Sequence, residues 1–247
     1  MKVIFHEAFY EVYAQEAAAE AGRMEAIVEA IQPNVDFVTA EPASEIQIAA
    51  AHAMAHVGHV RGSGLYSIAA LAAGGAIQAA RIGLHEPAFG LIRPPGHHAS
   101  RDSAWGFCYF NNMAVALLTL REEGLIRNAV VLDIDLHFGD GTVSILGQED
   151  WVKIHNPRER SRQNYIQNVA HILSGVRVDL IGVSAGFDYH IDDWGGVLAT
   201  EDYFAIGNIV SKAAQACGGG CFAILEGGYN QDVLGHNVAA LIEGLSC

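Results

Sequence analysis

Short apolar runs alternate with alanine-rich helical stretches along almost the whole chain, and this alternation limits the fold more than any other feature. The run Ala129–Ile134 is hydrophobic almost throughout, as expected of a strand with both faces covered. Strands separated by helices of about ten or more residues form parallel β-α-β units. The predicted strands are Lys2–Phe5, Phe37–Val38, Ala88–Ile92, Ala129–Ile134, Trp151–Ile154, Asp179–Ser184 and Cys221–Leu225.

The stretches between these strands predict helices. Ser44 is the expected N-cap of one of them, because Gln47 completes a capping box three residues later. No repeat or linker divides the chain, so residues 1–247 are expected to form a single doubly wound α/β domain with a mostly parallel sheet. The predicted helices are Gln15–Ile31, a helix from Ser44 through Ala55 or beyond, Ser67–Ile82, Asn111–Glu123, Asn164–Leu173, Glu201–Cys217 and His236–Leu245.

Composition excludes several classes of protein. Hydrophobic residues make up 51% of the 247 residues and charged residues 17%, which is not the balance of a disordered chain. A net charge of −14 argues against a general nucleic-acid binder. The stretch Gly64–Leu84 lacks the Leu, Ile and Phe run of a membrane span. The first residues show no signal peptide and the four cysteines form no CxxC pair, so a cytoplasmic location is expected.

Four of the predicted strands are followed by residues that carry chemistry. In an open α/β sheet, ligands bind beyond the carboxyl ends of the strands. Four such segments at one edge of one sheet are unlike the scattered polar residues of ordinary loops. The segments are Arg93–His98, Asp133–Asp140, Gly186–Asp188 and Glu226–Tyr229.

The second segment predicts a metal site. Residues two apart in an extended strand point the same way, so Asp133, Asp135 and His137 are expected on one face. Buried carboxylates need positive compensation, and carboxylate with imidazole suits zinc. A salt-bridge network or exposure to water is the alternative. Asp188 from another strand end completes three protein ligands, which leaves a fourth position open for water or substrate.

The remaining segments predict acid–base chemistry. His97 and His98 follow a Pro-Pro-Gly turn, and we interpret them as acid–base groups instead of further metal ligands. Asp133 and Asp140 are available to hold their second nitrogens, which fixes the tautomer and raises the basicity of an imidazole. Tyr229 follows two glycines and can donate a hydrogen bond to a developing oxyanion, although Gly-Gly-Tyr alone is only a turn.

Together these residues resemble the zinc-dependent histone deacetylase superfamily, most closely its acetylpolyamine amidohydrolase and class-II-like bacterial branches. The resemblance implies an arginase/deacetylase fold. It also implies a hydrolase of linear amides that removes an acetyl or other acyl group from a small-molecule or peptide amine, such as acetyl-lysine or acetylpolyamine. The matching segments are VIFHEAF at Val3–Phe9, RPPGHHA at Arg93–Ala99, GFCYFNN at Gly106–Asn112, VLDIDLHFGDGT at Val131–Thr142, GFD at Gly186–Asp188 and EGGYN at Glu226–Asn230.

The resemblance also implies a role for each matching residue. One Zn²⁺ per chain would be bound by Asp135, His137 and Asp188. Phe107 and Gly106 would line the substrate channel.

The same resemblance assigns the proton transfers. His98 would act on the attacking water as general base and then as the acid for the leaving amine, with His97 as its electrostatic companion. Asp133 would support His97, and Asp140 would support His98. Tyr229 would polarise the amide carbonyl together with zinc.

The chain departs from the family in two segments that look shortened, one between His52 and Ser67 and one after Trp151–His155. No residue matches the second aromatic wall of the channel or the acidic gatekeeper of polyamine enzymes, so a shallower, more open channel is expected. The substrate therefore stays open. A deacylase of another N-acetylated small molecule and a non-catalytic zinc-binding interaction protein are the alternatives, and a homo-oligomer is a candidate assembly.

The second shortened segment is rich in basic residues, with Lys153, Arg158, Arg160 and Arg162 within ten positions. A solvated loop is the simpler interpretation, and a rim that attracts an anionic substrate is the alternative. Relatives bind a structural K⁺ near Asp133, and the ammonium group of Lys153 is a candidate to replace it.

Three further features have simpler interpretations. His52, His56 and His59 have helical spacing without a carboxylate or cysteine, which favours a helix surface over a metal site, although His52 resembles a structural histidine of the family. Cys108 is expected to be a small buried packing residue. The segment Trp194–Gly196 is expected to shape the rim of the pocket.

Overall fold

The computed structural model describes residues 1–247 and contains one sheet of seven strands. Every predicted strand is present, with ends that differ by two residues at most. All paired strands are parallel, which confirms the α/β class. The strands are β1 (Lys2–Phe5), β2 (Asp36–Thr39), β3 (Ala88–Gly90), β4 (Ala129–Asp133), β5 (Val152–His155), β6 (Leu180–Ala185) and β7 (Gly220–Leu225), and their order across the sheet is β2-β1-β3-β7-β6-β4-β5.

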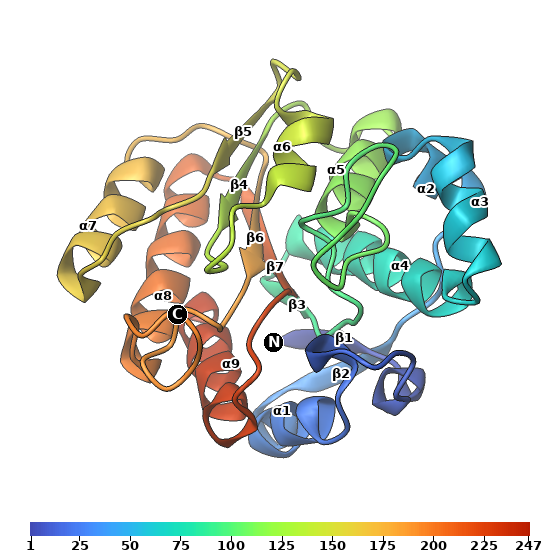
Figure 1. Ribbon diagram of the computed structural model, residues 1–247. Coiled ribbons are helices and arrows are strands. Elements are labelled where there is room, and N and C mark those ends of the chain that lie inside the picture. Colours follow the sequence, from blue (N-terminus) through green and yellow to red (C-terminus); the bar gives the residue numbers. More distant parts are fainter.

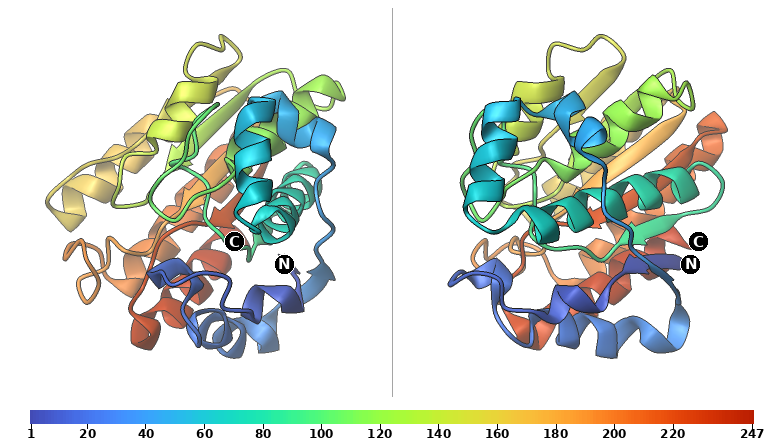
Figure 2. Two further views of the ribbon diagram at one scale, coloured as in Figure 1. Left: turned by 45° about the vertical axis from the view of Figure 1, so that its right-hand side comes forward. Right: turned by 90° about the vertical axis from the view of Figure 1, so that its right-hand side faces the viewer.

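Nine α-helices surround this sheet in two layers (Figure 1). Helix α4 packs on β1, β3 and β7 with α5 beside it, whereas α8 packs on β6 and β7 from the other layer, with α9 and α7 against it. Figure 2 shows the helices α2 and α3 in the same layer as α4 and α5. The helices are α1 (Arg23–Ile31), α2 (Glu45–Ala51), α3 (Met54–Gly62), α4 (Tyr66–Gly83), α5 (Asn112–Glu122), α6 (Asp140–Leu146), α7 (Arg162–Leu173), α8 (Thr200–Cys217) and α9 (Gln231–Leu245).

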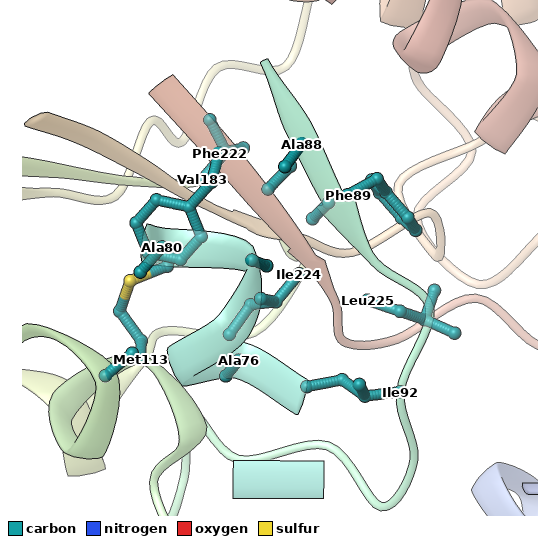
Figure 3. Packing of buried hydrophobic residues seen from close by; sticks show 14 of the residues in the cluster. Ala76, Ala80, Ala88, Phe89, Ile92, Met113, Val183, Phe222, Ile224 and Leu225 are labelled. Atoms are coloured by element: carbon teal, nitrogen blue, oxygen red, sulfur yellow. The ribbon is translucent and has the colours of Figure 1, made fainter. Parts of the chain in front are cut away.

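Helix α4 lies close against the sheet because its buried face is built from alanine and glycine. A Cβ atom at Gly74 would collide with the backbone oxygen of Glu41, and one at Gly75 would lie 2.7 Å from a methyl carbon of Ile92. Figure 3 shows Ala76 and Ala80 of this helix packed with side chains of β3 and β7. None of the helices in the structure is both long enough and apolar enough to cross a membrane.

Two predicted helices are each interrupted. The stretch Gln15–Ile31 contains a 3-10 turn at Ala17–Ala19, and α1 begins only after Gly22, whose φ of 86° breaks the helix. The helix that follows Ser44 has the predicted capping box but ends at Ala51, and α3 begins after the extended residues His52 and Ala53. His52, at this interruption, contacts Ser100 and Asn111 in the segment between β3 and α5.

The strand order brings the four predicted segments together. Strands β3, β7, β6 and β4 are consecutive neighbours in the middle of the sheet. Each of these four strands is followed by one of the segments that the sequence singled out. Since parallel strands share one carboxyl edge, the prediction that these segments converge is confirmed.

Candidate active site

The three predicted metal ligands meet where β4 and β6 end. The Nδ1 atom of His137 lies 3.2 Å from Oδ1 of Asp135 and 3.0 Å from Oδ2 of Asp188. One donor atom from each of the three residues lies within 4.8 Å of the others. The two carboxylates are buried, whereas the His137 side chain is 39% exposed, so the group is reached from solvent through His137.

Backbone amides orient the two carboxylates. Oδ1 of Asp135 accepts a hydrogen bond from the His137 amide at 2.8 Å, and Oδ2 accepts one from the Gly227 amide at 2.9 Å. Oδ1 of Asp188 accepts from the Leu136 amide at 3.0 Å, and its buried Oδ2 lies 3.0 Å from Nδ1 of His137. Two oriented carboxylates and an imidazole match the three protein ligands of a catalytic zinc site, so the residues present fit this ion.

The charges in this group are strongly coupled. Hydrogen bonds to Asp135 and Asp188 raise the pKa of His137 to about 10. Burial raises the pKa of Asp188 to about 7, and the neighbouring charge of Asp135 adds to that shift. Burial opposes ionisation of Asp135 as well, but the charge of His97 and the hydrogen bonds from His137 and Gly227 lower its pKa overall. A positive charge at this position is therefore strongly favoured.

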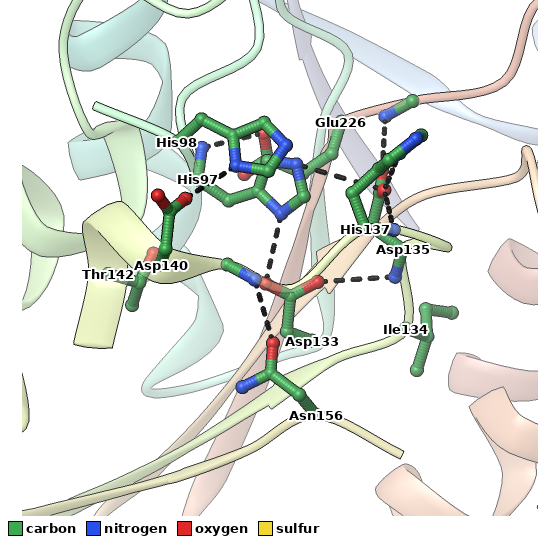
Figure 4. A network of polar contacts seen from close by, with 12 residues as sticks. His97, His98, Asp133, Ile134, Asp135, His137, Asp140, Thr142, Asn156 and Glu226 are labelled. Carbon is green, nitrogen blue, oxygen red and sulfur yellow. Dashed lines mark hydrogen bonds and ion pairs between the residues drawn. The ribbon is translucent and has the colours of Figure 1, made fainter. Parts of the chain in front are cut away.

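Two histidine–aspartate pairs lie beside the group (Figure 4). Nδ1 of His97 lies 3.1 Å from Oδ2 of Asp133, and Nδ1 of His98 lies 2.6 Å from Oδ1 of Asp140. The two imidazole rings are 4.0 Å apart between centroids. Because a carboxylate accepts hydrogen bonds, neutral His98 carries its proton on Nδ1 and keeps Nε2 unprotonated.

The two histidines have opposite pKa shifts. Burial alone would lower the pKa of His97, but the charges of Asp135 and Asp133 raise it well above its usual value. Burial lowers the pKa of His98 to about 4; the charge of His97 lowers it as well, whereas Asp140 opposes the shift. Adjacent groups whose environments push their pKa values apart are typical of catalytic sites.

The prediction that Asp133, Asp135 and His137 share one face of a strand is wrong in detail. Strand β4 ends at Asp133, and the chain then turns. Asp133 contacts His97 through Oδ2, whereas the His137 imidazole contacts Asp135 and Asp188. The turn is formed by Oδ1 of Asp135 accepting the His137 amide, a local hydrogen bond typical of aspartate after a strand.

Glu226, at the end of β7, holds the turn that precedes the histidine pair. Its side chain is buried, and Oε2 accepts hydrogen bonds from the amides of Gly96 at 2.7 Å and His97 at 3.2 Å. Burial raises the pKa of Glu226 to about 7. The carboxylate thus ties the end of β7 to the turn that carries the histidine pair.

The turn that carries Tyr229 is held from both sides. The buried Arg23 of α1 donates from Nε to the oxygen of Gly228 at 2.8 Å and from Nη2 to the oxygen of Glu226 at 2.7 Å. Oδ2 of Asp193 accepts the amides of Tyr229 and Asn230, both at 2.8 Å. Burial raises the pKa of the Tyr229 phenol, so the hydroxyl stays protonated and able to donate. Arg23 and Asp193 belong to no motif, and the sequence did not reveal them.

A cavity of about 150 Å³ opens above these groups. Trp194 stacks on Tyr229 with ring centroids 4.0 Å apart, and Phe107 makes a T-shaped contact with Tyr229 at 5.8 Å between centroids. Trp105 covers His98. Trp105 and Trp194 thus form aromatic walls of the cavity. The resemblance to the family predicted neither wall, and Trp194 was expected only as part of the rim. The lining residues are Pro95, His97, His98, Trp105, Gly106, Phe107, His137, Trp194, Gly227 and Tyr229.

The prediction that Lys153 replaces a structural cation at Asp133 is wrong. Lys153 lies opposite Val130 in the sheet, three residues before Asp133, and its side chain is exposed. The basic segment Lys153–Arg162 also has fewer unpaired charges than its composition indicated. Arg162 forms ion pairs with Glu201 and Asp202 at the start of α8, at 2.6 Å each.

The prediction of a helix surface is wrong for His56, which is buried, and right for His59, which is exposed. His52 is buried too, in keeping with its resemblance to a structural histidine of the family. His52 accepts the Asn111 amide on Nε2 at 2.9 Å, so its Nδ1 donates to the oxygen of Ser100. His56 donates from Nε2 to the oxygen of Tyr109 at 2.7 Å. Both histidines therefore brace the loop between the His97–His98 turn and α5.

Comparison with known proteins agrees with this geometry. The family described as Histone deacetylase domain matches residues 61–165 and 152–245. The chain belongs to the histone deacetylase family. The crystal structure of the HDA15 HD domain superposes with a TM-score of 0.87 and 25% sequence identity, over 99% of this chain and 89% of that one.

Curated relatives of this histone deacetylase family member include archaeal and bacterial proteins. A "Probable deacetylase" of Methanothermobacter thermautotrophicus is 32% identical, and the match covers 98% of this chain and 90% of the relative. A "Histone deacetylase-like amidohydrolase" of Pseudomonas aeruginosa is also 32% identical, over 75% of this chain and 60% of the relative. The archaeal alignment spans 302 positions against 247 residues here, so that deacetylase carries segments that this chain lacks.

Proposed function

We propose that this member of the histone deacetylase family is a zinc-dependent amidohydrolase that removes an acetyl group from an acylated amine. The observation that carries the proposal is the convergence of three kinds of groups on one cavity of about 150 Å³. These are the Asp135–His137–Asp188 triad, the His97 and His98 pairs with their aspartates, and the Tyr229 phenol.

The triad would hold the zinc ion through Nδ1 of His137 and one carboxylate oxygen each from Asp135 and Asp188. When bound, zinc lowers the pKa of water toward about 7 and polarises an amide carbonyl. The neighbouring amides keep the two carboxylates aimed at one point, so little reorganisation accompanies binding.

The histidines would move the protons. His98 is neutral near pH 7 because its pKa is lowered to about 4, so its free Nε2 can accept a proton from water as the C–O bond forms. The same Nε2–H then protonates the amide nitrogen as the C–N bond breaks, which releases the amine and a carboxylate. His97 is charged and lies 4.0 Å from His98, where it favours the negative charge of the tetrahedral state.

The Tyr229 hydroxyl would donate a hydrogen bond to the oxyanion. Its raised pKa keeps the phenol protonated, and the bonds from Arg23 and Asp193 to the surrounding backbone fix the turn before the reaction begins. A preorganised donor of this kind is among the larger contributions to amide hydrolysis.

The composition of the cavity lining is compatible with several substrates that share a linear amide. It contains aromatic rings, imidazoles, proline and glycine but no lysine, arginine, aspartate or glutamate. Acetyl-lysine peptides, acetylpolyamines and other N-acetylated small molecules all carry the linear amide that the site would hydrolyse. The decisive experiment is an assay of all three classes with protein whose zinc content has been confirmed. No turnover of any of them at full zinc occupancy would favour a non-catalytic zinc-binding protein.

Zinc affinity is expected to rise with pH. The metal-free protein keeps His137 protonated below its pKa of about 10, and zinc binds only the neutral imidazole, so each ion displaces a proton. The affinity should therefore increase roughly tenfold per pH unit between about pH 7 and 8. Competition with a chromophoric chelator, calibrated in the same buffers, measures this. An affinity that stays constant across this range would contradict the assigned ligand.

Gly186→Ala is expected to lower zinc affinity by about 10- to 100-fold. The new Cβ would collide with Oδ2 of Asp135, and this buried carboxylate has no room to retreat because Gly227 also closes against it. Gly58→Ala is the matched control, since a Cβ there meets no atom within 4 Å. Metal analysis and chelator competition on both variants test this, and equal affinity in the two would refute the close approach.

A further inference from the structure

Trp105 makes two specific contacts although it is 56% exposed. Its indole Nε1–H donates to Oδ2 of Asp140 at 2.9 Å. The indole ring lies over the His98 imidazole, with centroids 3.8 Å apart and the planes tilted by 30°. Without these two contacts Trp105 would be an ordinary surface residue. The contacts therefore indicate a specific role for this side chain.

The contacts place Trp105 on the solvent side of the His98–Asp140 pair. The Asp140 side chain is 48% exposed, yet the His98 side chain is only 3% exposed. Asp140 uses Oδ1 for His98 and Oδ2 for Trp105, so both carboxylate oxygens have a partner and rotation of the carboxylate is restricted. The indole therefore covers the imidazole and fixes the carboxylate that orients it.

The backbone around Trp105 is shaped for this placement. Gly106 has a φ of 59° and Phe107 a φ of 67°, and the Cys108 amide closes the turn on the oxygen of Trp105 at 3.1 Å. A Cβ atom at Gly106 would collide with the His98 ring, so this turn approaches the imidazole as closely as glycine allows. Positive φ at a phenylalanine is costly, and such strain persists only where the surroundings hold it.

We propose that Trp105 is a positioning residue for the general base. By donating to Asp140 and covering His98, it keeps Nδ1 of His98 bound to the carboxylate and Nε2 aimed into the cavity. This inference rests on the proposed amidohydrolase function and adds to it a residue that acts through Asp140. A hydrogen bond to a charged acceptor is among the stronger ones, so its loss should be measurable in the rate.

Trp105→Phe keeps an aromatic ring over His98 and removes the N–H donor. We expect kcat to fall about 10-fold with KM changed by less than about 2-fold, because the contact acts on the chemical step. Trp151→Phe is the matched control. Trp151 donates from its indole to Oε2 of Glu149 at 2.8 Å outside the cavity, so this variant loses the same kind of bond without effect on kcat.

A double-mutant cycle with Asp140→Asn separates positioning from a role as cavity wall. If Trp105 acts through the carboxylate, Trp105→Phe should lower kcat by less than about 2-fold in the Asp140→Asn background. Independent, multiplicative losses in the cycle, or a change confined to KM, would overturn the proposal while leaving the deacetylase function intact. An inactive zinc-loaded wild type would instead overturn the proposed function, and the positioning role with it.

The contact itself has a readout besides activity. The chain has three tryptophans, so a ¹H–¹⁵N spectrum should show three indole N–H signals, and Trp105→Phe identifies one of them. Asp140→Asn should shift the Trp105 signal and leave the Trp151 signal in place, in both zinc-free and zinc-loaded protein. A Trp105 signal that does not respond to Asp140→Asn would show that the hydrogen bond is absent and overturn the proposal.

Discussion

His98→Ala is expected to lower kcat by about 10²- to 10⁴-fold while zinc remains bound. The imidazole is the proposed base of the site, with Nδ1 held 2.6 Å from Asp140 and a pKa lowered to about 4. Alanine can neither accept the proton of water nor return it to the amide nitrogen. Because His98 is not among the three candidate ligands, the loss should fall on the rate and leave the metal content unchanged.

Steady-state kinetics with an acetylated substrate, together with metal analysis, would test this expectation. His59→Ala is a suitable control, because His59 is an exposed histidine on α3 outside the cavity. A His98→Ala variant with a rate within about 10-fold of wild type would move the general base to another residue. His97 would then be the first candidate, since its ring lies 4.0 Å away.

Tyr229→Phe is expected to keep the fold and the zinc and to lower kcat by about 10²- to 10³-fold. The substitution removes only the hydroxyl, so the stacking of the ring on Trp194 at 4.0 Å is retained. The lost hydrogen bond would form chiefly in the transition state, when negative charge develops on the carbonyl oxygen. The effect should therefore appear in kcat more than in KM.

Tyr66→Phe provides the comparison for this measurement, because it removes a phenol hydroxyl on α4 outside the cavity. Both variants should be assayed at equal zinc occupancy. Equal rates for Tyr229→Phe and wild type would refute the role of the phenol in holding the oxyanion, and would leave that role to the metal alone.

The strands and the residues after them could be predicted from the sequence because both depend on local patterns. A run such as Ala129–Ile134 can be buried on two faces only in the middle of a sheet, and the polar residues behind it then fall at one edge. The candidate metal triad follows from that placement, and the pairing of each histidine with its aspartate follows from the resemblance to the family.

The parts that could not be predicted depend on contacts between distant segments. Arg23 reaches the oxygens of Glu226 and Gly228, more than 200 residues away, and no spacing in the sequence records such a bond. The break of the first helix depends on a single left-handed residue, Gly22. Lys153 failed as a cation at Asp133 because its position in the strand register places it three residues too early.

The central position of β3, β7, β6 and β4 links the chemistry to the cooperative unfolding of the molecule. These strands are buried on both faces, and the candidate ligands and the histidine pair lie in turns anchored at their ends. Such strands exchange their amide hydrogens only through the largest opening events, unlike edge strands and loops. The turns of the site are therefore anchored to the strands that we expect to exchange most slowly in the protein.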